Sequence, residues 1–280
     1  MSDSNNDLLA KLLKHFKCRF KLQLYISIML NVYIYTNKLL FRIINAFINS
    51  GSAKYLSGFD PAADMHQLYA KLGQSILHIF PNRDNSKCII SSDTRYLYVT
   101  FRGTADFTDS SNLINSWSIS KNIHGNGGRR GFVERLDTLT RERGGVARIL
   151  NEIANSEKHR HKKIIISGHS IGAAVAALFV VQNQSPEFNK KIKYIFLYGC
   201  PNIGDESFYK IFNTYFSNKC FNCINENDWV IHMHGFNSSS IGRRIQLGRQ
   251  TQSFYRSIMS HIPYNYARSI YDEICRIQPR

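Results

Sequence analysis

The chain has 280 residues, with 36 lysines and arginines against 20 acidic residues, a formal net charge of +16. No nucleic-acid-binding motif accompanies this charge, so lipid headgroups are the favoured anionic partner, and solubility alone is the alternative role of the charge. Six cysteines, among them one C-x-x-C (Cys220 and Cys223) without a second pair, exclude a disulfide scaffold and a zinc ribbon and favour buried free thiols.

Residues 1–50 are predicted to form a separate basic, amphipathic helical region. Polar and charged side chains interrupt its apolar stretch before the roughly 20 apolar residues that a membrane span needs. No small-residue cleavage site follows closely, which argues against a signal peptide. The region either packs on the next domain, residues 51–280, or lies on a membrane surface, and a signal anchor is the third alternative. We expect a secreted or peripherally membrane-associated protein, with a cytoplasmic location as the alternative.

Between residues 60 and 154 the pattern alternates between periodic apolar runs and polar segments. Residues 105–121 are polar with a few large apolar side chains, which is typical of a mobile flap; a surface loop docked by Trp117 is the alternative. The predicted elements are a helix over 60–77, strands over 87–90 and 95–101, a flexible basic loop over 124–130, and a helix over 131–154 broken at Gly144-Gly145.

Eleven residues, 163–173 (KIIISGHSIGA), organise the rest of the chain. The β-branched run predicts a strand buried on both faces, and the alanine-rich segment after it predicts a helix that ends near Gln182. Between them Gly168, Ser170 and Gly172 form G-x-S-x-G, the pattern of a nucleophile elbow. The glycines are needed because a Cβ on either side of so sharp a turn would collide with neighbouring backbone. Ser170 is therefore the candidate nucleophile.

After this stretch strands and helices alternate to the end of the chain. This alternation predicts an α/β fold with a mostly parallel central sheet and helices on both faces. The later predicted elements are a strand over 194–198, a helix over 206–216, a strand over 220–225, a strand-like segment over 244–254 and a last helix that opens at 261.

A serine nucleophile needs a base and an acid that orients the base, in the chain order serine, acid, histidine. Asp228 follows a predicted buried strand directly and is our candidate acid, with Glu226 as the runner-up. His261 lies beyond a further strand and is our candidate base, because His232 and His234 follow the acid too closely to reach a different loop.

The reaction also needs N–H donors that stabilise an oxyanion. The backbone amide of Ile171, at the start of the helix after Ser170, is one candidate. Thr104, at the end of the earlier strand in the sequence FRGT, is the other.

Five motifs in this order resemble the class 3 lipase family, the fungal-type lipases of the α/β-hydrolase superfamily, which also includes phospholipases A1. The motifs are FRGT (101–104), GHSIGAA (168–174), YGCPNIGD (198–205), the N-x-x-D loop at 225–228 and H-x-x-Y at 261–264. The resemblance implies Ser170, Asp228 and His261 as catalytic residues, Thr104 and Ile171 as the oxyanion hole, and a lid over residues 106–118. The chain departs from the family by Ala173 and by the expanded segment GNGGRR (125–130).

These observations predict a serine esterase acting on ester-linked lipids, either a phospholipase A1 or an acylglycerol lipase, at a membrane or droplet surface. No cofactor and no metal is required, and no nucleic-acid partner is expected. The alternative is a catalytically inactive hydrolase fold that binds lipid or protein.

Overall fold

The computed structural model describes residues 66, 69–70, 73–80, 88–103, 119–123, 126–141, 145–232, 240–249, 257, 259–261, 265–266, 268–270 and 272. The basic region (1–50), Thr104 and residues 105–118 of the predicted flap lie outside these residues, and what was predicted of them stays a prediction; residues 119–121 of the predicted flap belong to a strand. Within the described ranges, no helix has both the length and the apolar character to cross a membrane.

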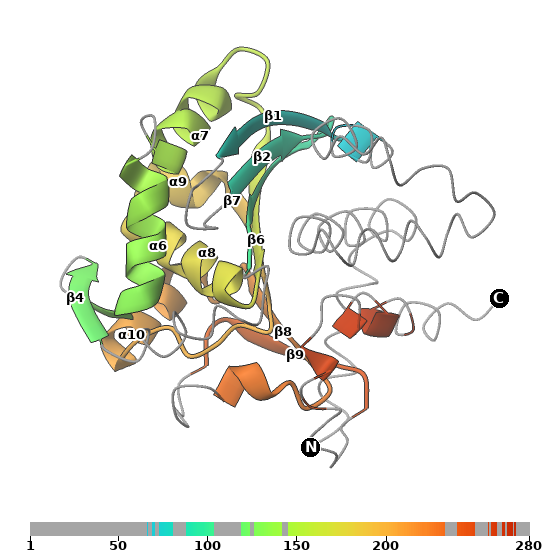
Figure 1. The fold of residues 1–280 in the computed structure, drawn as a ribbon. Coiled ribbons are helices and arrows are strands. Elements are labelled where there is room, and N and C mark those ends of the chain that lie inside the picture. Colours follow the sequence, from blue (N-terminus) through green and yellow to red (C-terminus); the bar gives the residue numbers. More distant parts are fainter. Residues whose placement is uncertain are drawn as a thin grey trace, which may run out of the picture.

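A seven-stranded sheet forms the centre of the molecule, in the order β1-β2-β3-β6-β7-β8-β9 (Figure 1). From β3 to β9 neighbouring strands are parallel, and β1 and β2 add an antiparallel edge. The predicted mostly parallel sheet is confirmed. Its strands are β1 (Ser75–Phe80), β2 (Cys88–Ser92), β3 (Tyr96–Phe101), β6 (Lys163–His169), β7 (Ile192–Tyr198), β8 (Cys220–Asn225) and β9 (Arg243–Leu247).

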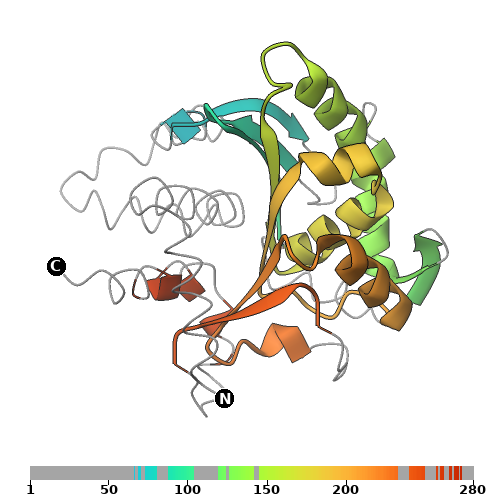
Figure 2. The ribbon, with the colours of Figure 1, turned by 180° about the vertical axis from the view of Figure 1, so that it is seen from behind.

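Helices lie on both faces of this sheet. One face is covered by a layer of helices, which lies to the left of the sheet in Figure 1 and to the right of it in Figure 2. On the other face, helical residues near the C-terminus place Tyr266 and Ile270 in an apolar cluster with strand residues. The covering layer consists of α6 (Arg130–Arg141), α7 (Gly145–Asn155), α8 (Ile171–Gln182), α9 (Pro186–Lys191) and α10 (Glu206–Phe216).

The β-branched run of β6 explains why this strand lies at the centre. Ile164 and Ile166 belong to the apolar cluster on the α8 side, and Ile165 belongs to the cluster on the opposite side. Because successive side chains of a strand point to opposite faces, an unbroken apolar run suits a strand covered on both faces. The helix that follows is apolar on all sides, and every residue from Ile171 to Val181 is buried.

The cysteines agree with the prediction of buried free thiols. Cys88, Cys200, Cys220 and Cys223 are all free and buried, and the other two cysteines lie outside the described residues. In β8, Cys220 packs in the helix-side cluster and Cys223 in the opposite one. The C-x-x-C therefore spans the two faces of the sheet and cannot act as a dithiol pair.

The predicted helix over 60–77 is too long. His66, Tyr69 and Ala70 are helical, but Gly73 adopts a left-handed backbone with φ of +69° and β1 follows directly. The apolar spacing of this stretch fits a helix as well as a strand. Pairing with β2, which lies beyond the next loop, makes residues 75–80 a strand.

The predicted flexible loop over 124–130 is also wrong. Residues 126–129 form β5 (Asn126–Arg129), which pairs with β4 (Ile119–Ile123) as a separate two-stranded sheet. Two further contacts come from far along the chain: the Arg129 N–H donates to Ile203 O (2.8 Å), and Gly128 forms a bridge with Gly204. Glycine-rich sequence shows no strand alternation, so only these distant contacts reveal β5.

The remaining boundaries need two smaller corrections. The strand-like segment predicted over 244–254 is β9, which ends at Leu247 before Gly248 (φ +65°), and residues 250–254 lie outside the described ranges. Helical residues precede His261 as well as follow it, so His261 occupies a turn rather than opening the last helix.

The predicted break between α6 and α7 is confirmed. Gly145 at this break and Gly73 before β1 have nearly equal φ, so a comparison of the two tests why position 145 needs a glycine. A Cβ at Gly145 (φ +73°) would lie 2.4 Å from Thr140 O, whereas a Cβ at Gly73 (φ +69°) meets nothing within 4 Å. Gly73→Ala should lower the free energy of unfolding by roughly 1–2 kcal/mol, the cost of a left-handed alanine. Gly145→Ala should lose about 1–3 kcal/mol more through the clash. Urea unfolding followed by circular dichroism measures both, and equal losses would contradict the explanation.

Candidate active site

Ser170 lies at the apex of a turn without any intervening loop between β6 and α8. Its backbone has φ 56° and ψ −129°, a conformation that costs a non-glycine residue roughly 1–3 kcal/mol. Hydrogen bonds hold this geometry: the Ser170 N–H donates to Tyr198 O (2.9 Å), and Ser170 O accepts from the Ala173 N–H (2.9 Å). The predicted strained elbow is confirmed.

The two glycines around Ser170 let three segments of backbone touch. A Cβ at Gly168 would lie 2.2 Å from Gly172 O, and a Cβ at Gly172 would lie 2.4 Å from Phe101 O at the end of β3. Neither position has room for any side chain. The close contact brings the start of α8 against the end of β3, as the G-x-S-x-G pattern predicts.

The structure brings Ser170, His261 and Asp228 into one line of hydrogen bonds. The Ser170 hydroxyl donates to His261 Nε2 (2.8 Å), and His261 Nδ1–H donates to Asp228 Oδ2 (2.8 Å). The tautomer is assigned from these partners. All three side chains are buried. Ser170, His261 and Asp228 thus have the mutual geometry of a nucleophile, a base and an orienting acid, in that order.

Asp228 is fully buried, and burial by itself raises the pKa of a carboxyl group. The neighbouring His261 and three hydrogen bonds outweigh this effect and hold the pKa of Asp228 below its usual value. The donors are His261, the Tyr266 hydroxyl (2.6 Å to Oδ2) and the Val230 N–H (2.9 Å to Oδ1), at the start of the 3₁₀ helix η5 (Trp229–His232). The carboxylate stays ionised and available to stabilise a protonated His261.

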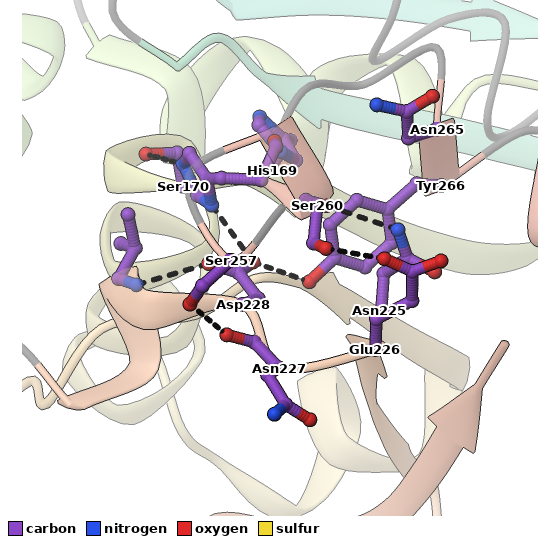
Figure 3. A network of polar contacts seen from close by, with 12 residues as sticks. His169, Ser170, Asn225, Glu226, Asn227, Asp228, Ser257, Ser260, Asn265 and Tyr266 are labelled. Carbon is purple, nitrogen blue, oxygen red and sulfur yellow. Dashed lines mark hydrogen bonds and ion pairs between the residues drawn. The ribbon is translucent and has the colours of Figure 1, made fainter. Parts of the chain in front are cut away.

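Tyr266 is a member of this site that the sequence analysis missed. It lies in the predicted last helix, where its position carries no sign of a carboxylate partner 38 residues earlier. Figure 3 shows the Tyr266 hydroxyl pointing to the Asp228 carboxylate. Tyr264, the tyrosine of the H-x-x-Y motif, lies outside the described residues.

Glu226, the runner-up acid, has a different role. Its backbone is left-handed (φ 47°), and its Oε2 accepts from the Ser260 hydroxyl (2.6 Å) instead of from the His261 ring. Asn225 Nδ2 donates to Ser260 O (3.0 Å), and the Ser257 hydroxyl donates to Asn227 O. Figure 3 shows these contacts between the two loops. Residues 225–227 therefore anchor the segment that precedes His261.

His169 is the second residue whose role was not foreseen. Its Nε2 lies 2.8 Å from His261 O, and the two imidazole rings lie 4.7 Å apart at 31°. Burial, and then the neighbouring His261, lower the pKa of His169 to about 3. His169 is therefore neutral near pH 7, and its Nε2–H donates to the carbonyl.

Of the two candidate oxyanion donors, the structure describes Ile171. Ile171 begins α8, and the Ser170 side chain makes no capping hydrogen bond to this helix, so the first-turn N–H groups beside Ser170 are suited to stabilise an anion. Thr104 lies outside the described residues, one position beyond Gly103. The preceding residues Phe101 and Arg102 contact Gly172 of the elbow. In the described ranges, no group of three or more His, Cys, Asp or Glu side chains could hold a metal ion.

Gly199 leaves the space that the acid and base occupy. A Cβ there would lie 2.6 Å from Asp228 Oδ2 and 2.9 Å from His261 Nδ1. Gly199→Ala should displace this pair and lower the rate at which a fluorophosphonate labels Ser170 by at least ~100-fold. Gly73→Ala is the matched control, because it places alanine at a similar φ in open space and should label at the wild-type rate. Equal labelling rates in the two variants would show that Asp228 and His261 do not need the space left by Gly199.

The neutral, buried His169 makes stability depend on pH. An unfolded histidine takes up a proton below about pH 6.5, whereas His169 in the folded protein stays unprotonated down to about pH 3. The unfolded state then binds more protons, so the free energy of unfolding falls as the pH drops below 6.5, by up to about 1.4 kcal/mol per pH unit from this group.

Urea unfolding between pH 7.5 and 5 measures this slope above the range in which Asp228 titrates. His169→Gln should make the slope shallower. An unchanged slope in the variant would assign the pH dependence to other groups.

A model of the lipase (class 3) family matches residues 98–238, just over half of the chain, and no curated protein matches. The native propeptide complex of Rhizomucor miehei lipase is 18% identical, with a TM-score of 0.56, over 80% of this chain and 67% of that one. Nonglycosylated LIP2 lipase of Yarrowia lipolytica is 14% identical, with a TM-score of 0.56, over 82% and 79% of the two chains. These structures share the α/β-hydrolase fold, and the family match shows that this chain is a carboxylic ester hydrolase of the class 3 lipase family.

Proposed function

We propose that the protein is a serine esterase that hydrolyses ester-linked lipids with Ser170 as nucleophile, His261 as base and Asp228 as the orienting acid. The observation that carries the proposal is the continuous line of hydrogen bonds from the Ser170 hydroxyl through His261 to Asp228. A serine hydroxyl is a weak nucleophile near pH 7, and this arrangement supplies the base that it needs.

The reaction proceeds through an acyl-enzyme. His261 Nε2 takes the proton of Ser170 as Oγ attacks the acyl carbonyl, and Asp228 stabilises the imidazolium that forms. The backbone amides of Ile171 and Thr104 stabilise the oxyanion, and His261 then protonates the departing alcohol. Water, activated by His261, releases the fatty acid and restores Ser170.

One group of basic residues in the described part of the chain lies far from Ser170. Exposed basic residues lie where β6, β7 and β9 begin: Lys163, Lys193 and Arg243. Ser170 follows the opposite end of β6, roughly 20 Å away at about 3.3 Å per strand residue. These three side chains therefore do not lie beside the ester bond that Ser170 attacks.

Two solved structures with this fold guide the choice of substrate. One is a triacylglycerol lipase whose catalytic centre is a serine-protease triad, and the other is a fungal lipase in complex with an inhibitor, which serves as a model for interfacial activation. They support an acylglycerol at a lipid surface as the first substrate to test, with phospholipase A1 activity as the second. Hydrolysis of triacylglycerol, phosphatidylcholine and phosphatidylglycerol emulsions separates these two activities.

Labelling with a fluorophosphonate tests the nucleophile. Wild type should be labelled at one site, and Ser170→Ala should lose both labelling and about 10⁴–10⁶-fold in kcat on a short-chain ester. Equal labelling of the variant contradicts the assignment of Ser170, and a wild type that resists labelling supports the inactive hydrolase fold instead.

Two matched variants test the acid. Asp228→Asn should lower kcat by about 10⁴-fold, because the neutral amide cannot stabilise the imidazolium. Glu226→Gln loses only a contact to Ser260 and should lose far less. Comparable losses in the two variants would contradict the choice of Asp228.

A further inference from the structure

We infer that His169, the residue before the nucleophile, is a positioning residue for the base, because its imidazole holds the backbone carbonyl of His261. The inference rests on the proposed function and adds a residue to it. His169 does not contact the reacting atoms; it acts through His261.

The strand geometry of β6 gives His169 access to His261. In β6, Ile165 belongs to the apolar cluster that contains Tyr266, and His169, four residues later, lies on the same face. The segment that carries His261 and Tyr266 passes over this face. The His169 ring contacts both rings there, at 4.7 Å from His261 and 5.6 Å from Tyr266. Ser170 thus directly follows the last residue of β6, and that last residue, His169, donates a hydrogen bond to the backbone carbonyl of the base His261.

The contact completes a clamp on two successive peptide groups. Asn225 Nδ2 donates to Ser260 O (3.0 Å), and His169 Nε2–H donates to His261 O (2.8 Å). The first bond fixes the chain before His261 and the second fixes His261 itself. The ring nitrogens of His261 are used for Ser170 and Asp228, so they do not restrain the backbone independently. Loss of the second bond lets the ring shift, and a misplacement of about 1 Å costs on the order of 100-fold in rate.

The surroundings of His169 suit a neutral donor. The titratable groups that face it are His261, Asp228 and Tyr266. Its Nδ1 is buried and has no hydrogen-bond partner among the described residues, so a proton there would add an unpaired charge. A charge on His169 would also oppose the imidazolium that His261 must form. Neutral His169 therefore supports His261 without raising the energy of the charged intermediate.

Two variants of similar size separate the hydrogen bond from packing. Gln keeps an amide N–H at about the reach of Nε2, and Met has similar length without a donor. We would measure kcat and KM on a soluble short-chain p-nitrophenyl ester, with the active enzyme concentration set by fluorophosphonate titration, so that a smaller folded fraction does not lower kcat.

His169→Met should lower kcat by roughly 10–100-fold with KM changed by less than about twofold, and His169→Gln should stay within about threefold of wild type. A wild-type kcat in the Met variant, or an equal loss in both variants, overturns the inference. If the Met variant does not fold, His169→Phe, which keeps a ring against His261 and Tyr266, replaces it under the same criterion. Wild type that neither labels at Ser170 nor hydrolyses the ester contradicts the proposed function instead.

Discussion

The site depends on a contact between backbones that leaves no room for side chains. Gly168 touches Gly172, and Gly172 touches the end of β3 at Phe101. This contact holds the start of α8 against the sheet and keeps Ser170 in a conformation that a non-glycine residue otherwise avoids. Strain of roughly 1–3 kcal/mol is tolerated because a strand buried on both faces and a fully buried helix fix the turn from either side.

The second constraint is a carboxylate with no exposure to water. A buried charge is strongly unfavourable unless hydrogen bonds compensate for its lost hydration. Asp228 obtains them from His261, Tyr266 and the Val230 N–H, which belong to two separate segments. Removal of a single donor leaves the remaining charge undercompensated, so the carboxylate ties the segment after β8 to the segment that carries the base.

Much of the fold could be predicted because local sequence and burial agree. The bounds of α10 and β8 match their predicted ranges, since each shows a clear period and a sharp end. The predictions of helices and strands were wrong where the local sequence pattern is absent or fits two structures. β1 has apolar spacing that fits either a helix or a strand, and β5 is a glycine-rich segment stabilised by Ile203 and Gly204, more than 70 residues away.

The sequence by itself determined the elbow, the order of nucleophile, acid and base, and the choice of Asp228 and His261, because each follows from its place after a strand. The tertiary structure alone decided that Glu226 anchors Ser260, that Tyr266 binds Asp228 and that His169 binds the carbonyl of His261. Those contacts join residues 34 to 92 positions apart. The direction of a side chain across such a distance depends on how the layers pack, which no local pattern in the chain encodes.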